Sequence, residues 1–501
     1  MSEHDNASTS LGAALASALT ELCQSGGVEV HEDSELLAAL TPFQFEVRAE
    51  GKHTVLHLWS EERNLARRVL RIVEQSDGNL RLEIQKFGHS KPGRLEFVVP
   101  ERARPDARLK RERFRARFRQ LLAETFPDEE IESLASTPDL ARSFSGSYTR
   151  GLMRRGQRAW ALMGVSGQED AATVDAMLSC ALIWLDWQRE HAQRTAVAGV
   201  RLFLPAGSSL VTVHRLQALS AHAPAEIYEI DESAWHARRV DPQDIGNLAT
   251  WLTPRRDVEQ TLHSAHEIVA RVRALAPEAI DAVVPPGTRE VALRFRGLEF
   301  ARWRHGRLFY GLPDEERRPL GADNWKPLEE LLKRLSAHRS REAAETHHPL
   351  YRAQAERWLE TSVLMDPARL DAQLDPRYLY SQVPAFSAGD RGVIDLLGVT
   401  RGGRLAVIEL KASEDIQLVM QTVDYWLRVR WHQRQGDFPR YGYFSGIELQ
   451  AKAPRLYLVA PGFRFHPATE TILRYLKEEI EVTCVGVNET WRQGVQVVFR
   501  R

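Results

Sequence analysis

The chain has 501 residues, 43% of them hydrophobic and 27% charged, which is the composition of a globular protein with about two to four domains. Its formal net charge of −1 excludes a strong basic field over the whole molecule, so any contact with nucleic acid must depend on local patches. The three cysteines, Cys23, Cys180 and Cys484, form no CxxC pair, which argues against a disulfide framework or a thiolate zinc site.

The amino-terminal residues, Met-Ser-Glu-His-Asp, are acidic where a signal peptide would carry positive charge. The sequence contains no run of about 18 apolar residues, so no transmembrane helix is expected. Together with the cysteine usage, these features predict a cytoplasmic protein that has no membrane partner.

The pattern of strands, helices and prolines divides the chain into five predicted parts. They are a tail with a short helix (1–33), a β-rich region (34–110), an α/β domain (111–240), a helical linker with a small antiparallel sheet (241–346), and a C-terminal domain (347–501). The β-rich region includes the expected strands Thr54–Trp59 and Leu80–Gln85. The small sheet is expected to contain Glu290–Phe295, Leu298–Trp303 and Arg307–Tyr310.

The C-terminal domain is predicted to have mixed α/β structure, with a sheet covered by helices on both faces. Its expected helices are Tyr351–Met365, Ile416–Arg434 and Pro467–Glu479. Its expected strands are Leu379–Ala385, Gly392–Val399, Arg404–Ala412, Arg455–Val459 and Glu481–Val487. The whole chain is therefore predicted to be an α+β multidomain protein.

The α/β domain and the C-terminal domain share a weak sequence pattern. GQRAWALMGVSGQED in the first resembles GGRLAVIELKASED in the second, and in both a helix with a Trp-Leu pair, a strand, a short helix and a final strand follow. The pattern indicates a diverged internal duplication, with chance recurrence of a common α/β order as the alternative. The first copy has Gly164 and Ser166 where the second has Glu409 and Lys411. The first copy would therefore be degenerate, with the same fold but without these charged residues.

Three ionisable residues interrupt two neighbouring apolar strands of the C-terminal domain. Asp395 lies within GVIDLLGV, and Glu409 and Lys411 share one face of the alternating strand RLAVIELKA. An unpaired buried charge costs at least several kcal/mol, and a divalent cation removes that cost by neutralising both carboxylates. The alternative is a structural ion pair between lysine and a carboxylate at the end of the sheet.

Asp395, thirteen intervening residues and then Glu409-Leu410-Lys411 resemble the D…ExK signature of the PD-(D/E)xK nuclease superfamily. The resemblance implies a restriction-endonuclease-like mixed sheet flanked by helices. It also implies that Asp395 and Glu409 bind Mg²⁺ or Mn²⁺, with the Leu410 carbonyl as a third ligand. Lys411 would then orient the attacking water or offset charge on the phosphorane.

The RecB-like branch of this superfamily adds a glutamate on the preceding helix and a QxxxY motif on the following one. Both are present, as Glu356 or Glu360 and as Gln421-Thr-Val-Asp-Tyr425. Glu356 falls nearer the apolar stripe of its helix and is the first candidate, with Glu360 as the alternate. The resemblance covers residues 347–501 and is similar to the mismatch-cleaving endonucleases of this branch, although their substrate is not transferred to this chain.

The resemblance implies a metal-dependent nuclease that hydrolyses phosphodiester bonds of nucleic acid, with DNA as the expected substrate and a homodimer as a possible state. Gln417, Arg428 and His432 share the side of the helix that carries Gln421 and Tyr425, and they could extend a groove for the nucleic-acid backbone. A ribonuclease and a catalytically inactive nucleic-acid-binding or scaffolding protein are the alternatives. No phosphate-binding loop, zinc-ligand spacing or serine-hydrolase elbow occurs in the sequence.

Overall fold

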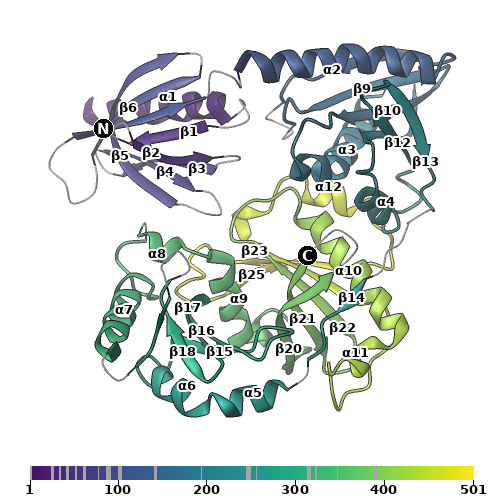
Figure 1. Ribbon diagram of the computed structural model, residues 1–501. Coiled ribbons are helices and arrows are strands. Elements are labelled where there is room, and N and C mark those ends of the chain that lie inside the picture. The colour runs from purple at the N-terminus through teal and green to yellow at the C-terminus, as the bar shows by residue number, and fades with distance from the viewer. Residues whose placement is uncertain are drawn as a thin grey trace. The chain divides into compact units, whose positions relative to one another are not determined.

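The computed structural model of the protein is a mixed α/β structure in which the described residues form four β-sheets (Figure 1). The structure describes residues 3–23, 28–32, 35–40, 44–50, 53–59, 64–76, 78–85, 92–99, 104–139, 144–192, 195–243, 250–255, 257–312, 317–321, 324–346, 348–386 and 392–501. His347, where the predicted C-terminal domain begins, lies outside them. Within these ranges, no helix is both long enough and apolar enough to cross a membrane.

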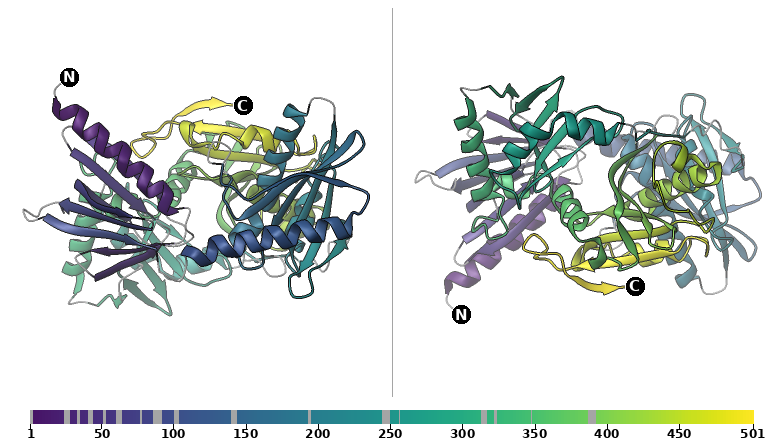
Figure 2. Two further views of the ribbon diagram at one scale, coloured as in Figure 1. Left: turned by 90° about the horizontal axis from the view of Figure 1, so that it is seen from above. Right: turned by 90° about the horizontal axis from the view of Figure 1, so that it is seen from below.

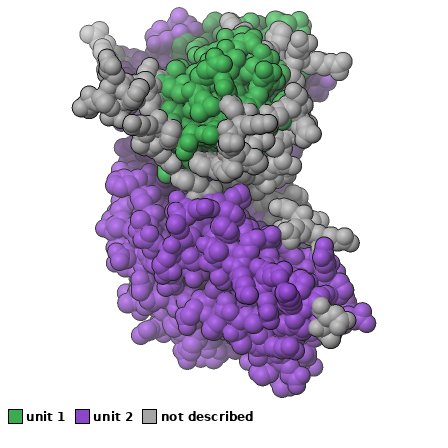
Figure 3. Space-filling view, turned by 90° about the vertical axis from the view of Figure 1, so that its left-hand side faces the viewer, with its two compact units in different colours: residues 1–127, 133–149 green, residues 128–132, 150–501 purple. Residues whose placement is uncertain are grey.

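The chain forms two compact units, residues 1–127 with 133–149 and residues 128–132 with 150–501 (Figure 3). The first unit contains a seven-stranded antiparallel sheet with the order β2-β1-β7-β6-β5-β4-β3. Its strands are β1 (Val28–Glu32), β2 (Glu35–Leu40), β3 (Gln44–Glu50), β4 (His53–Trp59), β5 (Asn64–Ser76), β6 (Asn79–Gln85) and β7 (Pro92–Val98). Its helices are α1 (Glu3–Cys23) and α2 (Arg104–Thr125).

Helix α1 covers the apolar face of this sheet (Figure 2). Leu15 and Leu19 of the helix are buried together with Leu82 and Phe97 of the sheet, so burial of apolar area holds the two layers together. The segment predicted as a tail with a short helix therefore forms part of the core. The strands expected at Thr54–Trp59 and Leu80–Gln85 correspond to β4 and β6, and the boundary predicted between residues 110 and 111 falls inside α2.

The second unit contains a small antiparallel sheet in which five strands follow each other in chain order. They are β15 (Ile280–Val283), β16 (Val291–Phe295), β17 (Leu298–Arg304), β18 (Arg307–Tyr310) and β19 (Arg318–Pro319). The helices before and after it are α5 (Val258–Ser264), α6 (His266–Arg273) and α7 (Trp325–His338). Leu328 and Leu332 of α7 are buried against Phe295 and Phe300 of the sheet. The three strands predicted for this region are confirmed as β16 to β18.

A six-stranded sheet has the order β13-β12-β11-β10-β9-β8. Its strands are β8 (Glu130–Ala135), β9 (Tyr148–Arg155), β10 (Arg158–Val165), β11 (Ala196–Pro205), β12 (Ala225–Asp231) and β13 (His236–Val240). Helix α3 (Ala171–His191) connects β10 to β11, and α4 (Leu210–Leu216) connects β11 to β12. We call β9 to β13 with α3 and α4 the first repeat.

The C-terminal sheet has seven strands in the order β14-β20-β21-β22-β23-β24-β25. They are β14 (Trp251–Leu252), β20 (Leu374–Phe386), β21 (Val393–Thr400), β22 (Leu405–Leu410), β23 (Arg455–Pro461), β24 (Val482–Val487) and β25 (Val497–Arg500). The associated helices are α8 (Pro349–Arg352), α9 (Ala355–Met365), α10 (Leu418–Gln435), α11 (Asp437–Arg440) and α12 (Thr469–Leu473). We call β21 to β25 with α10 and α12 the second repeat.

The two repeats have the same topology. In the second repeat β21 and β22 are antiparallel, β22, β23 and β24 are parallel, and β25 is antiparallel to β24. In the first, β10, β11 and β12 are parallel and β13 is antiparallel to β12. Strands β9 and β10 are separated by two residues, a connection that can join only antiparallel neighbours. The structure thus supports the internal duplication that the sequence pattern indicates.

Two predicted helices are shorter than expected because other contacts use their backbone groups. The helix expected at Tyr351–Met365 is divided into α8 and α9 at Gln354, which has a left-handed φ of 45°. Arg339 lies beside this break and donates to the carbonyl of Ala353 at 2.6 Å. The helix expected at Pro467–Glu479 ends at Leu473, since the backbone after it pairs with the first repeat.

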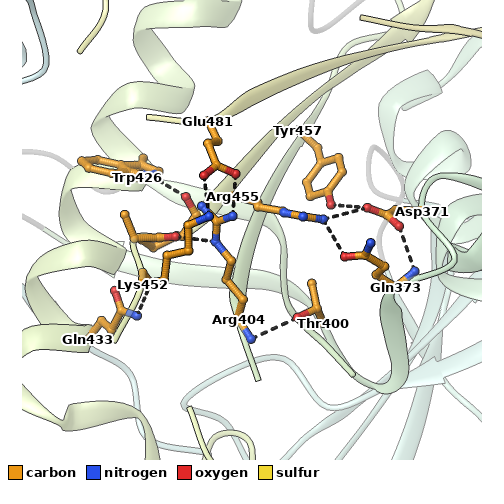
Figure 4. A network of polar contacts seen from close by, with 12 residues as sticks. Asp371, Gln373, Thr400, Arg404, Trp426, Gln433, Lys452, Arg455, Tyr457 and Glu481 are labelled. Carbon is orange, nitrogen blue, oxygen red and sulfur yellow. Dashed lines mark hydrogen bonds and ion pairs between the residues drawn. The ribbon is translucent and has the colours of Figure 1, made fainter. Parts of the chain in front are cut away.

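A polar network holds the amino-terminal ends of β22 and β23 (Figure 4). Arg404, directly before β22, donates to Glu481 at 2.5 Å and to the carbonyl of Ala453 at 2.7 Å. Lys452 lies 2.7 Å from the same Glu481 carboxylate. Hydrogen bonds from Arg404 and Lys452 lower the pKa of Glu481 to about 2. Because β22 and β23 are parallel, this network places their carboxyl-terminal ends side by side at the opposite edge.

The buried guanidinium of Arg339 joins the small sheet to α8 and to the break that follows it, and it generates a first prediction. It donates to the carbonyls of Phe295, Arg296, Leu350 and Ala353 at 2.6 to 3.3 Å. We expect Arg339→Met to lower the free energy of unfolding by about 3 kcal/mol or more, since buried carbonyls would lose their donors. Urea denaturation measures the loss, and Arg318→Met at an exposed position is the control. An equal loss in both variants would contradict the role of Arg339.

Candidate functional site

The acidic residues singled out in the sequence lie where two strands of the C-terminal sheet diverge. The antiparallel pairing of β21 with β22 ends at Leu396 and Ile408, one residue before Asp395 and Glu409 would pair. The parallel pairing of β22 with β23 continues to Leu410. The strands therefore form a fork, and the continued register places Asp395 and Glu409 on the same face of the sheet.

Asp395 accepts hydrogen bonds at the opening of this fork. Its Oδ2 accepts from the backbone N–H of Leu410 at 3.0 Å, and its Oδ1 accepts from the side-chain amide of Gln382 at 3.2 Å. Burial raises the pKa of Asp395, while the N–H of Leu410 and the charges of Arg357 and Lys411 act in the opposite direction. The backbone thus holds this carboxylate at a defined place without removing the cost of its charge.

Glu409 is more deeply buried, with 2% of its surface exposed. Its Oε2 is buried and has no hydrogen-bond partner among the described residues. The ammonium nitrogen of Lys411 lies 3.8 Å from Oε1 of Glu409 and 3.6 Å from Oδ2 of Asp415. Burial, followed by the charge of Asp395, raises the pKa of Glu409 well above its usual value. The two carboxylates therefore share one space in which their combined charge is only partly balanced.

Lys411 directly follows β22, and its side chain is largely buried. Burial by itself would lower its pKa, but the surrounding carboxylates outweigh burial and raise it. In decreasing order of effect, these are Glu356, Glu409, Asp415 and Asp395. Its ammonium is therefore charged at neutral pH and lies within the acidic cluster that the sequence predicts.

Helix α9 places two glutamates near Asp395, and Glu360 is the more buried, with 1% exposure. It accepts hydrogen bonds from Arg294 at 3.2 Å, from Arg357 at 2.9 Å and from Gln382 at 2.6 Å. Burial raises the pKa of Glu360 to about 7, although both arginines oppose the shift. Its position indicates that it ties α9 to the small sheet and to β20.

Glu356 is only partly buried, but it is the glutamate nearer to Lys411. Burial raises its pKa, the charge of Lys411 lowers it, and the backbone N–H of Ala412 donates a hydrogen bond to it. The sequence argument placed Glu356 closer to the apolar stripe than Glu360, whereas Glu360 is more deeply buried because two arginines and an amide compensate its charge. The contacts with the Lys411 segment, rather than burial, favour Glu356 as the site carboxylate.

Gln382 is a site residue that sequence reasoning missed. Its side-chain amide donates to both Glu360 and Asp395 and so connects α9 with β21. It has a left-handed φ of 53° and is omitted from the β20–β21 pairing, which continues at Ser381 and Val383 on either side. The sequence shows only a polar residue within an apolar strand, and the strand register was needed to place it opposite Asp395.

The QxxxY pair lies on one side of α10, where the amide of Gln421 donates to the hydroxyl of Tyr425 at 3.1 Å. Burial, and after it the charge of Glu409, raises the pKa of Tyr425. The phenol hydroxyl therefore stays protonated at neutral pH close to the acidic cluster. The structure brings both motif residues to the side of the sheet on which Glu409 projects.

Two other residues of α10 are not part of an open groove. Arg428 is buried and donates to the carbonyl of Ala385 at 2.6 Å, and His432 is buried with Nδ1 2.7 Å from the Asp437 carboxylate. The expectation that Arg428 and His432 extend a surface for the nucleic-acid backbone is therefore wrong, whereas Gln417 is only partly buried. The polar groups of Arg428 and His432 hold α10 against β20 and α11, because buried polar groups need partners inside the protein.

The donor atoms at the fork fit a hard divalent cation that keeps part of its water shell. Among the described residues, no three His, Cys, Asp or Glu side chains are close enough to form a closed metal cage. Mg²⁺ commonly uses only one or two carboxylates and completes its shell with water and substrate oxygens. The unpartnered Oε2 of Glu409 beside Asp395 satisfies this requirement. The N–H of Leu410, whose carbonyl is the third predicted ligand, donates to Asp395.

Comparison with known proteins does not assign the chain to a family. No protein-family model matches it, and the search of curated proteins found no match. The geometry of the fork and the residues around it therefore carry the functional argument.

The raised pKa values of Asp395 and Glu409 predict how stability depends on pH without metal. In the unfolded chain these carboxyl groups have a pKa of about 4, and in the folded protein their pKa is higher. The folded state therefore binds their protons more tightly, and the free energy of unfolding falls as the pH rises from the unfolded toward the folded pKa. In EDTA, we expect the free energy of unfolding of Glu409→Gln to fall less between pH 5 and 8 than that of the wild type. The difference should be about 1.4 kcal/mol for each pKa unit by which folding raises the pKa of Glu409. Urea denaturation at several pH values tests this, and parallel curves for both proteins would refute it.

Proposed function

We propose that the protein is a Mg²⁺- or Mn²⁺-dependent nuclease of the PD-(D/E)xK type that hydrolyses phosphodiester bonds of DNA. Residues 347–501 would form its restriction-endonuclease-like catalytic domain. The observation that carries the proposal is the pair of buried carboxylates, Asp395 and Glu409, whose charges the surrounding residues balance only in part. A cytoplasmic location is proposed with it, and the buried free thiols of Cys180 and Cys484 agree with a reducing compartment.

Each residue around the fork has a chemical role in this proposal. Asp395 and Glu409 hold the cation, which when bound polarises the scissile phosphate and lowers the pKa of a water molecule. Lys411 places a fixed positive charge where the attacking water or the phosphorane oxygens would lie. Gln421 and Tyr425 offer an amide and a protonated hydroxyl to a phosphate oxygen or to a bound water.

Glu356 and Gln382 are proposed to support this arrangement from two sides. Glu356 lies beside Lys411 and keeps its ammonium directed toward the acidic cluster. Gln382 holds one oxygen of Asp395, so that the carboxylate keeps a single orientation. Positioning of this kind matters because a small displacement of a reacting group can cost about 100-fold in rate.

A non-catalytic nucleic-acid-binding protein is the second candidate, and the position of Lys411 favours it. Lys411 lies between Glu409 and Asp415 and balances part of their charge without a cation. Such a protein would bind DNA equally well in EDTA and after Asp395→Ala. A ribonuclease would instead cut RNA and leave DNA intact with the same metal, so parallel assays on single-stranded DNA, duplex DNA and RNA separate the candidates.

Removal of the ammonium tests catalysis directly. We expect Lys411→Ala to lower the rate of DNA cleavage with Mg²⁺ or Mn²⁺ by about 100-fold or more, since charge developing at the phosphate loses its fixed counterion. Thermal unfolding should show that the variant remains folded. Lys333→Ala, which removes an exposed lysine of α7, is the matched control and should cleave at the wild-type rate. Cleavage that continues unchanged in Lys411→Ala or in EDTA would exclude the proposed mechanism.

The two helix glutamates are predicted to respond differently to neutral replacement. Glu356→Gln should reduce the cleavage rate by at least about 10-fold with little change in stability, because Glu356 contacts the Lys411 segment. Glu360→Gln should mainly lower the unfolding temperature, because Arg294 and Arg357 would lose a buried partner. Cleavage rates and melting curves of both variants decide the assignment, and the reverse pattern would transfer the site role to Glu360.

A further inference from the structure

The two repeats of the second unit contact each other through a backbone pairing that is symmetric. Leu219 and Leu476 form an isolated antiparallel bridge, and each lies three residues beyond its repeat's short helix, α4 or α12. The residue after each leucine donates its N–H to the carbonyl of the residue before the other leucine, at 2.8 and 2.9 Å. Exchanging the two repeats therefore reproduces the same pair of hydrogen bonds.

The side chains around this bridge are also reciprocal. Arg215 of α4 pairs with Asp424 of α10 at 2.7 Å, and Arg474, directly after α12, pairs with Asp186 of α3 at 2.8 Å. In both directions, an arginine at the short helix of one repeat reaches an aspartate on the long helix of the other. Helix α12 lies beside α3, and α10 contacts α4 (Figure 1). Such mutual contacts are the mark of an isologous interface, which relates two subunits by a twofold axis.

The strand register identifies the residue of the first repeat that occupies the place of Glu409. Pro205 and Pro461 form the last pairs of the equivalent parallel ladders β11–β12 and β23–β24. Glu409 pairs with Leu458, three residues before Pro461, and the residue three before Pro205 is Leu202, which pairs with Met163. Met163 therefore stands at the Glu409 position, one residue from Gly164, where the sequence pattern places it.

The first repeat accordingly has no metal-binding carboxylate at the twofold-related position. Strands β9 and β10, with the sequences YTRGLMRR and RAWALMGV, contain no aspartate, glutamate or lysine. Val165 follows Met163 at the spacing that separates Lys411 from Glu409. The symmetric pair of repeats thus contains one charged centre and one apolar counterpart.

We infer that the first repeat is a built-in partner that takes the place of a second nuclease subunit, so that each binding event cuts only one strand of a duplex. The cutting of a strand rests on the proposed nuclease function, whereas the pairing of the two repeats rests on their contacts alone. The strands of duplex DNA run antiparallel, so two centres that cut both strands at the same time are related by a twofold axis. Here the second position holds Met163, and the pairing surface of the second repeat is already covered within the same chain.

A disulfide crosslink tests the internal pairing without any use of enzymatic activity. Leu219 and Leu476 form a non-hydrogen-bonded antiparallel pair, whose Cα atoms lie about 4.5 Å apart, within the range of about 4.4–6.8 Å that a disulfide spans. The full-length Leu219→Cys/Leu476→Cys protein should crosslink within one chain and migrate faster on a non-reducing gel. The single variants are the controls. A covalent dimer, or no crosslink in a folded protein, would overturn the inference.

A second pair of variants tests the interface if the cysteines destabilise the protein. Arg215→Asp and Asp424→Arg should each lower the unfolding temperature, because each leaves two like charges at a buried contact. The double variant should recover a large part of the loss, since the ion pair is restored with its charges exchanged. Absence of recovery would show that these residues do not act as a pair between the repeats.

Strand cutting is then followed on a duplex with a different dye on each strand, with the enzyme in excess and Mg²⁺ present. We expect duplexes cut in one strand to form first, and doubly cut duplexes to appear only after a lag. Doubly cut product without a lag, from a protein that crosslinks within one chain, would overturn the one-strand inference while leaving the nuclease proposal intact. An intramolecular crosslink with no cleavage of any DNA would instead refute the proposed function and leave the pairing of the repeats standing.

Discussion

The burial and mutual repulsion of two carboxylates at a fork in the sheet determine the pKa values and the charge of this site. Asp395 and Glu409 project from the same face where β21 separates from β22, and burial raises the pKa of both. Asp395 has hydrogen-bond donors on both oxygens, but Glu409 keeps a buried oxygen without one among the described residues. Lys411 and Arg357 supply two positive charges to the three carboxylates of Asp395, Glu409 and Asp415, which leaves an excess of negative charge that a cation could balance.

The surrounding structure keeps these groups together by anchoring the elements that carry them. At one end of β22 and β23, Arg404 and Lys452 share the Glu481 carboxylate and set the position of both strands. At the other end, Glu360 connects α9 to β20 through Gln382. Burial of an acidic cluster is costly, and these contacts outside the cluster hold its strands and helix in place.

The first repeat shows that the carboxylates are not needed for the sheet to form. It has the same strand order and directions, although Met163 occupies the place of Glu409. An apolar residue at this position packs without an electrostatic cost, whereas Glu409 retains one. The second repeat therefore carries a destabilising feature that its own topology does not require, which is the pattern expected of a functional site.

Much of the local structure was predictable because it depends on periodicity within short segments. The strands from β16 to β18 and from β21 to β24 follow from alternating or continuous apolar residues, and Asp395, Glu409 and Lys411 stand out because they interrupt such runs. The division of Tyr351–Met365 into two helices was not predictable, since it depends on Arg339, which reaches the carbonyl of Ala353 from another element.

The sequence by itself determined most strands of the small sheet and of the C-terminal domain, the acidic pair with its lysine and the presence of two similar halves, because these are properties of neighbouring residues. Only the tertiary structure decided which glutamate faces Lys411, that Gln382 holds Asp395, and that Arg428 and His432 are buried. It also decided the reciprocal packing of the two repeats. Each of these facts depends on register and on contacts between distant segments, and one-dimensional spacing contains no information about which distant groups share a buried space.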